Sequence, residues 1–147
     1  MEIKDVLKLK NVFVIDEELD WKAAIHKAVD PLVKDGSVEE RYIDGIIENT
    51  EKLGPYYVLT EDVALLHARP DQGVIENQLA VLVNKKAVSF SDDGKHDARL
   101  MITLAAKDGE EHIKVIQALA TLLSDRKNID MIIDSINAED IYALMVK

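Results

Sequence analysis

The run Arg99–Ala106 most restricts how this chain can fold, because every residue from Leu100 to Ala106 except Thr103 is apolar. A strand with one wet face alternates apolar and polar side chains, whereas a strand buried on both faces is apolar almost throughout. The run therefore predicts the central strand of a sheet. Both faces of that sheet must be covered, and helices are the elements that cover such faces.

The order of the other expected elements agrees with a covered sheet. Apolar spacing predicts a short helix within 1–10, strands before His67 and at 12–15, 78–83 and 88–90, and helices at 21–33, 37–53, 113–123, 126–136 and from 137 onward. Local signals add N-caps at Asp20 and Asn137, a capping box of Ser37 with Glu40 and a turn at 84–86. Pro31 is expected to kink its helix or to cost it a hydrogen bond. The expected fold class is α/β (α+β), a single domain over 1–147 with a mixed β-sheet flanked by helices on both sides.

The composition excludes several classes of function. The absence of cysteine removes disulfides, thiolate catalysis and cysteine-based metal sites, and it fits a cytoplasmic location. The net charge of −10 argues against nucleic acid as a partner, because that affinity depends on neutralising phosphates. Apolar runs fall short of the roughly 20 residues that span a bilayer, so direct membrane insertion is not expected.

The four histidines are the main candidates for chemistry. No two of them have helical i, i+4 spacing, and the chain has no glycine-rich phosphate loop, so neither a metal site nor a nucleotide site is expected. His26, on a predicted helix, and His96, in a polar loop, are expected to be ordinary surface residues. His112 falls in the first turn of a predicted helix, where it is either a surface residue or part of an anion site.

His67 differs from the other histidines in its neighbours. It ends an apolar segment that starts at the turn Gly54-Pro55, and Arg69 and Pro70 follow it. A neutral imidazole is a nucleophile near physiological pH, and a guanidinium offers a planar fork of donors to phosphate oxygens. The pair suits reversible phosphorylation of a histidine. The alternative is a histidine at a strand end that is hydrogen-bonded to a backbone carbonyl.

The surroundings of His67 also match a known family. The matching segments are Gly54-Pro55-Tyr56-Tyr57-Val58, Ala64-Leu65-Leu66-His67-Ala68-Arg69-Pro70 with Gly73-Val74, Val88-Ser89-Phe90, Leu100–Ala106 and His112. With these segments the chain resembles the IIA domain of the bacterial phosphoenolpyruvate-dependent sugar phosphotransferase system, in the mannitol–fructose superfamily. Within that superfamily it is most similar to the ascorbate-type IIA proteins.

The resemblance implies a phosphohistidine carrier. His67 would accept a phosphoryl group from phospho-HPr and pass it to a cysteine of the cognate IIB protein, and the IIC permease would be involved only indirectly. His112 would orient or stabilise the phosphohistidine, and Arg69 would contact the phosphoryl group. The resemblance implies no cofactor.

Two departures from the family pattern bear on the site. The mannitol branch has an arginine upstream of the histidine, whereas Glu48-Asn49-Thr50-Glu51-Lys52 contains none. The family box usually has proline before the histidine, and here Leu66 takes that place. Two alternatives stay open: a regulatory IIA-like phosphorylation sensor without a transport role, and a module that keeps the fold without the chemistry.

Overall fold

The sheet of this protein is mixed and has five strands. The computed structural model describes residues 2–110 and 113–147. Along the sheet the order is β1-β4-β5-β3-β2, with parallel pairs β1/β4 and β3/β5 and antiparallel pairs β4/β5 and β2/β3. The strands are β1 (Leu7–Ile15), β2 (Val58–Thr60), β3 (Asp62–Leu66), β4 (Gln78–Ser89) and β5 (Asp97–Ala105). The strand predicted to be central, β5, is the middle strand.

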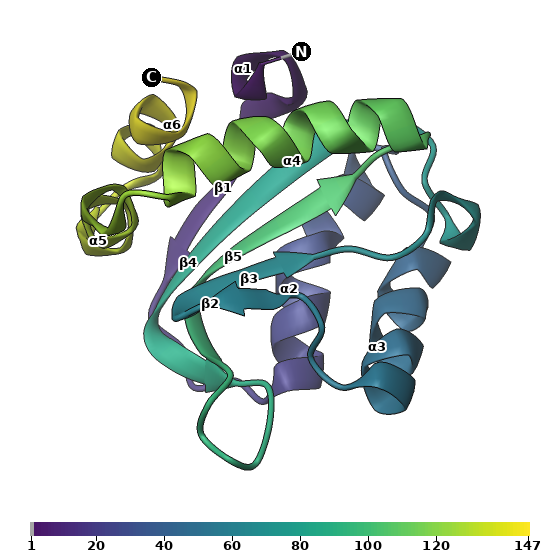
Figure 1. Ribbon diagram of the computed structural model, residues 1–147, viewed down its shortest axis with the longest axis horizontal. Coiled ribbons are helices and arrows are strands. Elements are labelled where there is room, and N and C mark those ends of the chain that lie inside the picture. Colours follow the sequence, from purple (N-terminus) through teal and green to yellow (C-terminus); the bar gives the residue numbers. More distant parts are fainter. Residues whose placement is uncertain (1) are drawn as a thin grey trace.

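Helices cover both faces of the sheet, as Figure 1 shows. One face carries α1, α4, α5 and α6, and the other carries α2 and α3. The bounds are α1 (Ile3–Val6), α2 (Trp21–Lys34), α3 (Arg41–Leu53), α4 (Gly109–Leu123), α5 (Arg126–Asp134) and α6 (Ala138–Val146), with a short 3-10 turn, η1 (Pro70–Gln72). The predicted fold class, a mixed sheet flanked by helices on both sides, is confirmed.

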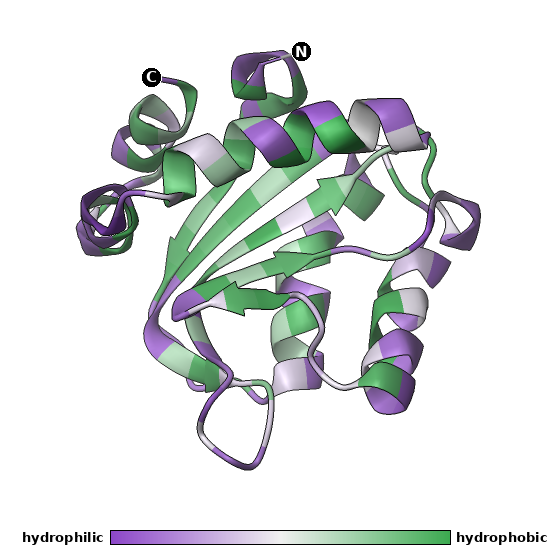
Figure 2. Cartoon of the chain, viewed as in Figure 1, coloured by the Kyte–Doolittle hydropathy of each residue, from purple (hydrophilic) through white to green (hydrophobic). Residues whose placement is uncertain are grey.

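The strand sequences explain this two-sided packing. In β4, Leu79, Val81 and Val83 pack under α4, α5 and α6, while Ala80 and Leu82 between them pack toward α2 and α3. Alternate residues of a strand face opposite sides of its sheet, so a strand covered twice must be apolar at every position. The hydropathy colouring in Figure 2 shows the resulting apolar sheet between helices with polar outer faces.

Several local predictions were confirmed and others were wrong. Asp20 and Asn137 cap α2 and α6 by accepting hydrogen bonds from backbone N–H groups. The capping box is absent, because α3 begins at Arg41 without a side-chain cap. Helix α2 is one continuous helix through Pro31 to Lys34, so the proline does not end it.

The predicted division of 78–90 was also wrong, because β4 is continuous across the expected turn at 84–86. At the N-terminus, helix α1 is shorter than expected, and β1 begins at Leu7 instead of residue 12. In both places the strand continues through an irregularity: the register of the β1/β4 pair shifts between Leu7 and Val12, and that of the β4/β5 pair shifts between Val83 and Val88. Pairing with a neighbouring strand on both sides of each shift keeps the strand continuous.

Candidate functional site

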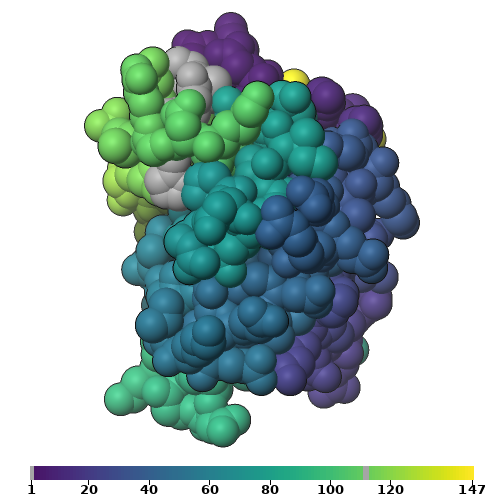
Figure 3. All heavy atoms as spheres, turned by 90° about the vertical axis from the view of Figure 1, so that its right-hand side faces the viewer, coloured from purple at the N-terminus to yellow at the C-terminus, as the bar shows by residue number. Residues whose placement is uncertain are grey.

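The site lies at the carboxyl ends of β3 and β5. These neighbouring strands are parallel, so His67, just after β3, and the start of α4, just after β5, come to the same edge of the sheet. A hollow of about 480 Å³ opens there, lined by Asn49, Leu53, Tyr56, His67, Ala68, Arg69, Pro70, Asp108 and Gly109. Figure 3 shows this side of the molecule, with α3 in blue, the segment around η1 in teal and α4 in green.

His67 is half-buried in this hollow, and its ring is held by its own strand. Its Nδ1 lies 2.7 Å from the carbonyl oxygen of Leu65. A carbonyl oxygen only accepts hydrogen bonds, so Nδ1 is the donor and carries the ring proton. In the neutral ring the lone pair is therefore on Nε2. A bond to a backbone carbonyl is what the alternative interpretation of His67 predicts, and the same bond also fixes the tautomer that a nucleophilic imidazole needs.

Two tyrosines contact the backbone at His67. The Tyr56 hydroxyl donates a hydrogen bond to the carbonyl oxygen of His67, and its ring meets the imidazole edge to face at a centroid distance of 5.3 Å. The Tyr42 hydroxyl accepts a hydrogen bond from the N–H of Ala68 at 3.0 Å. Burial raises the pKa of both phenols, so both stay protonated at neutral pH. Neither tyrosine stands out in the sequence as a functional residue.

Arg69 lines the hollow, and its guanidinium forms an ion pair with the Asp71 carboxylate. The guanidinium Nε lies 3.2 Å from Asp71 Oδ1, and the side chain is 67% exposed. The Arg69 backbone N–H donates to Gln72 Oε1, and Gln72 in turn pairs with Asn49 of α3. These bonds fix the loop after His67 against α3 and leave the guanidinium at the mouth of the hollow.

His112 lies outside the described residues, so its predicted role is not tested. Two of its neighbours in the chain, Asp108 and Gly109, line the hollow with His67. Gly109 is the first residue of α4, so the positive end of a helix dipole faces the hollow.

The other two histidines do not line the hollow. His26 is exposed on α2. His96 hydrogen-bonds Ser91 in the loop between β4 and β5, and Asp93 lies 3.5 Å from it. Within the described part of the chain, no group of three or more His, Asp or Glu side chains could hold a metal ion.

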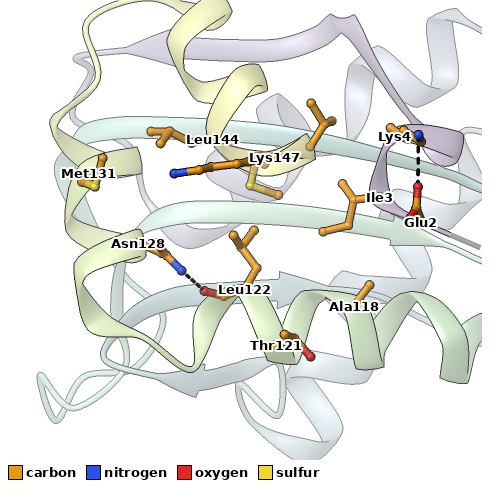
Figure 4. A pocket seen from close by; sticks show the side chains of 12 residues that line it. Glu2, Ile3, Lys4, Ala118, Thr121, Leu122, Asn128, Met131, Leu144 and Lys147 are labelled. Carbon is orange, nitrogen blue, oxygen red and sulfur yellow. Dashed lines mark hydrogen bonds and ion pairs between the residues drawn. The ribbon is translucent and has the colours of Figure 1, made fainter.

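A second hollow of about 780 Å³ lies between α1, α4, α5 and α6 (Figure 4). Its lining carries leucine and methionine side chains together with the ion pair of Lys4 with Glu2 and the Asn128 amide bonded to the Leu122 carbonyl. None of the residues that line it is a histidine. Of these two hollows, only the one at His67 has a histidine among the residues that line it. No helix in residues 2–110 and 113–147 is long and apolar enough to cross a membrane.

Comparison of the sequence with known proteins gives consistent matches. The profile of the family described as "Phosphoenolpyruvate-dependent sugar phosphotransferase system, EIIA 2" matches residues 5–147. The ascorbate-specific PTS system EIIA component of Escherichia coli (strain K12) is 33% identical over 132 residues, which are 88% of this chain and 86% of that protein.

Solved structures agree with the sequence matches. The solution structure of the mannitol-specific cryptic phosphotransferase enzyme IIA CmtB from Escherichia coli is 28% identical with a TM-score of 0.91, over 99% of each chain. The IIAMtl chain in its complex with phosphorylated enzyme IIBMtl from Escherichia coli is 28% identical with a TM-score of 0.82, over 95% of this chain and 98% of that one.

Proposed function

Since this chain belongs to the EIIA 2 family of the phosphoenolpyruvate-dependent sugar phosphotransferase system, we propose that His67 accepts a phosphoryl group from phospho-HPr and passes it to a cysteine of the cognate IIB protein. Members of this family are phosphotransfer proteins. In this function residues 1–147 form one IIA-type carrier domain. The IIC permease is a partner only indirectly, through IIB.

The observation that supports this role is the hydrogen bond from His67 Nδ1 to the Leu65 carbonyl. It puts the lone pair on Nε2, in a ring that lines an open hollow. Nε2 attacks the phosphorus in line, and the new P–N bond forms as the bond to the donor nitrogen breaks. The departing electron pair returns to the donor nitrogen, so the step needs no external oxidant or base.

The surroundings of His67 suit the charge of a phosphoryl group. In the proposed state, Arg69 turns from Asp71 toward the phosphoryl oxygens, and the start of α4 adds positive potential from the other side. His112 is proposed to orient or stabilise the phosphohistidine, as in the family. Phosphoryl transfer depends mainly on such positioning and electrostatics. An exposed Arg69 also suits a carrier, because a group held too tightly would not be released.

The complex of a structural neighbour with its phosphorylated IIB partner supports a IIB protein as acceptor. Transfer from His67 to a IIB cysteine thiolate would form a P–S bond as the P–N bond breaks, and the electron pair would return to Nε2. A regulatory IIA-like sensor would accept the group on the same histidine but would not deliver it to a cognate IIB.

Intact-mass measurement tests the proposal. The natural protein, His67→Ala and the control His26→Ala are incubated with phosphoenolpyruvate, enzyme I and HPr. We expect one acid-labile phosphoryl group on the natural protein and on His26→Ala, which removes an exposed histidine of α2. We expect none on His67→Ala.

Labelling that survives in His67→Ala would move the site, and His112→Ala would then test the second histidine. Natural protein that takes no phosphoryl group would contradict the carrier function and favour a module without the chemistry. Addition of the cognate IIB to labelled protein separates transport from sensing, because only a transport carrier loses its label to IIB.

A further inference from the structure

The peptide group that links His67 to Ala68 is held at both ends by tyrosine hydroxyls. At one end, Tyr56 donates to the His67 carbonyl oxygen, and at the other, the Ala68 N–H donates to Tyr42 at 3.0 Å. Backbone groups at a strand end have lost their ladder partners, so they need others. Here both partners come from side chains outside the sheet.

Tyr42 ties this peptide to the centre of the sheet. Its side chain extends from α3, is fully buried, and donates its own hydroxyl proton to the Leu104 carbonyl of β5 at 2.7 Å. One hydroxyl therefore bridges the loop after β3 and the end of β5. Burial keeps this hydroxyl protonated, since it raises the pKa of Tyr42 far above neutral pH.

Tyr56 contacts His67 twice. Besides the hydroxyl bond to the carbonyl, its ring stands edge to face against the imidazole at an interplanar angle of 89°. Tyr56 is itself braced by Tyr57, at a centroid distance of 4.9 Å, and Tyr57 by Phe90 at 5.4 Å. The imidazole thus rests against a row of aromatic rings that ends in the core.

We propose that Tyr56 and Tyr42 are positioning residues that fix the direction of the His67 ring by clamping the peptide that follows it. This inference rests on the proposed phosphocarrier function. Leu66 precedes His67, so no proline ring restricts the backbone on the N-terminal side. Rotation about the N–Cα bond of His67 would move its Cβ together with its carbonyl group, and so would separate Nδ1 from the Leu65 carbonyl and the His67 carbonyl from Tyr56. The two hydroxyls oppose that rotation.

Three variants and one matched control test the clamp. Tyr56→Phe removes the hydroxyl bond and keeps the ring, Tyr56→Leu removes both, and Tyr42→Phe removes the bond at the other end. The control is Tyr57→Phe, which removes a buried tyrosine hydroxyl that bonds Thr50 and not the 67–68 peptide.

The first readout is the tautomer of His67 in unphosphorylated protein, measured from its ring ¹⁵N shifts. We expect the Nδ1–H form in the natural protein and in Tyr57→Phe, and a mixture of tautomers in Tyr56→Phe that increases in Tyr56→Leu. The second readout is the rate of phosphoryl acceptance at saturating phospho-HPr, which should fall about tenfold to a hundredfold in Tyr56→Phe with the donor KM unchanged.

Tyr42→Phe should change the tautomer in the same direction and also lower Tm, because it removes the hydroxyl that bonds the buried Leu104 carbonyl and the part-buried Ala68 N–H. A Tyr56→Phe protein with the natural tautomer and the natural rate would overturn the clamp. The two proposals fail separately: natural protein that takes no phosphoryl group contradicts the carrier function, whereas the ¹⁵N measurement decides the clamp without any phosphoryl transfer.

Discussion

At the scale of single residues, the chemistry of this site depends on the hydrogen-bond and ion-pair partners of His67, Arg69 and Asp71. The His67 ring gives one nitrogen to the Leu65 carbonyl, which leaves the lone pair on the other. The Arg69 guanidinium is paired with Asp71 and must change partner to reach a phosphoryl group. An exposed ion pair of this kind contributes at most about 1 kcal/mol, so the exchange costs little.

We expect Arg69→Gln to slow phosphoryl acceptance about tenfold, because it removes a charged donor from the mouth of the hollow. This is below the loss expected for a buried donor, since the side chain is 67% exposed. The rate of Arg69→Lys should lie between the rates of the natural protein and of Arg69→Gln, because lysine keeps the charge and loses the planar fork of donors. Single-turnover kinetics with phospho-HPr measure these rates.

The matched control for Arg69 is Arg41→Gln. Arg41 is also exposed and bonds Glu39 and the Asp71 carbonyl, but it does not line the hollow. Its removal changes the net charge by the same amount. Equal rates for Arg69→Gln and Arg41→Gln would show that Arg69 acts only through overall charge.

At the scale of elements, the tight connection from β2 to β3 is fixed by Asp62. Its backbone is left-handed at φ 70°, and its carboxylate binds Arg99 of β5 at 2.9 Å and Arg126 of α5 at 2.8 Å. Hydrogen bonds from Arg99 and then Arg126 lower the pKa of Asp62, although partial burial opposes this. One side chain thus joins the strand that carries His67 to both its neighbour strand and a covering helix.

We expect Asp62→Asn to lower the free energy of unfolding by about 1–2 kcal/mol at pH 7, because it weakens two charge-assisted bonds. Asparagine tolerates the left-handed backbone, so the change isolates the charge. The folded-state pKa of Asp62 lies below its unfolded value of about 3.9. The stabilisation is therefore present above pH 4 and is lost as the pH falls through the folded-state pKa.

Urea unfolding of both proteins between pH 7 and pH 3 measures this difference. Asp130→Asn is the control, because Asp130 also pairs with Arg126 but is exposed at an i, i+4 position of α5. Its effect should stay within about 0.5 kcal/mol. An Asp62→Asn difference that does not shrink at acid pH would contradict the assignment to the carboxylate charge.

The elements also show which parts of the fold the sequence could predict. Apolar periodicity located the central strand, the helices on both faces and the residues at the end of β3. It failed at Asn84, which has the local signature of a turn but lies buried in β4. There its side-chain amide bonds both the N–H and the carbonyl of Glu17, far away in sequence. A partner of this kind leaves no local signal.

The same reason separates the predicted site residues from those that were missed. His67 and Arg69 stand close together in the sequence and could be found by their spacing. Tyr42 and Tyr56 meet the 67–68 peptide only after α3 and β3 have packed together. Tyrosines in an apolar pattern resemble core residues, and only the structure shows which groups their hydroxyls bond.

At the scale of the whole molecule, charge is the main property to explain. The chain has 28 acidic and 18 basic residues. The exposed Asp108 lines the hollow, and the exposed Asp71 pairs with Arg69, which also lines it. The resemblance to ascorbate-type IIA proteins is confirmed at the level of the family. In the proposed phosphocarrier function, the negative charge would act on the encounter with phospho-HPr. A negative surface speeds encounter with a partner that presents a basic face.

We therefore expect the second-order rate of phosphoryl transfer from phospho-HPr to fall about tenfold or more as ionic strength rises from about 0.01 M to about 0.1 M, since the Debye length shrinks from about 30 Å to about 10 Å. The rate at saturating donor should not change, because steering acts on encounter and not on the bound complex. Glu110→Gln, next to the hollow, should reduce the salt dependence more than Glu139→Gln on α6, which lies across the molecule from it (Figure 1). A second-order rate that is the same at low and high salt would mean that the acidic surface serves some other purpose, such as preventing self-association.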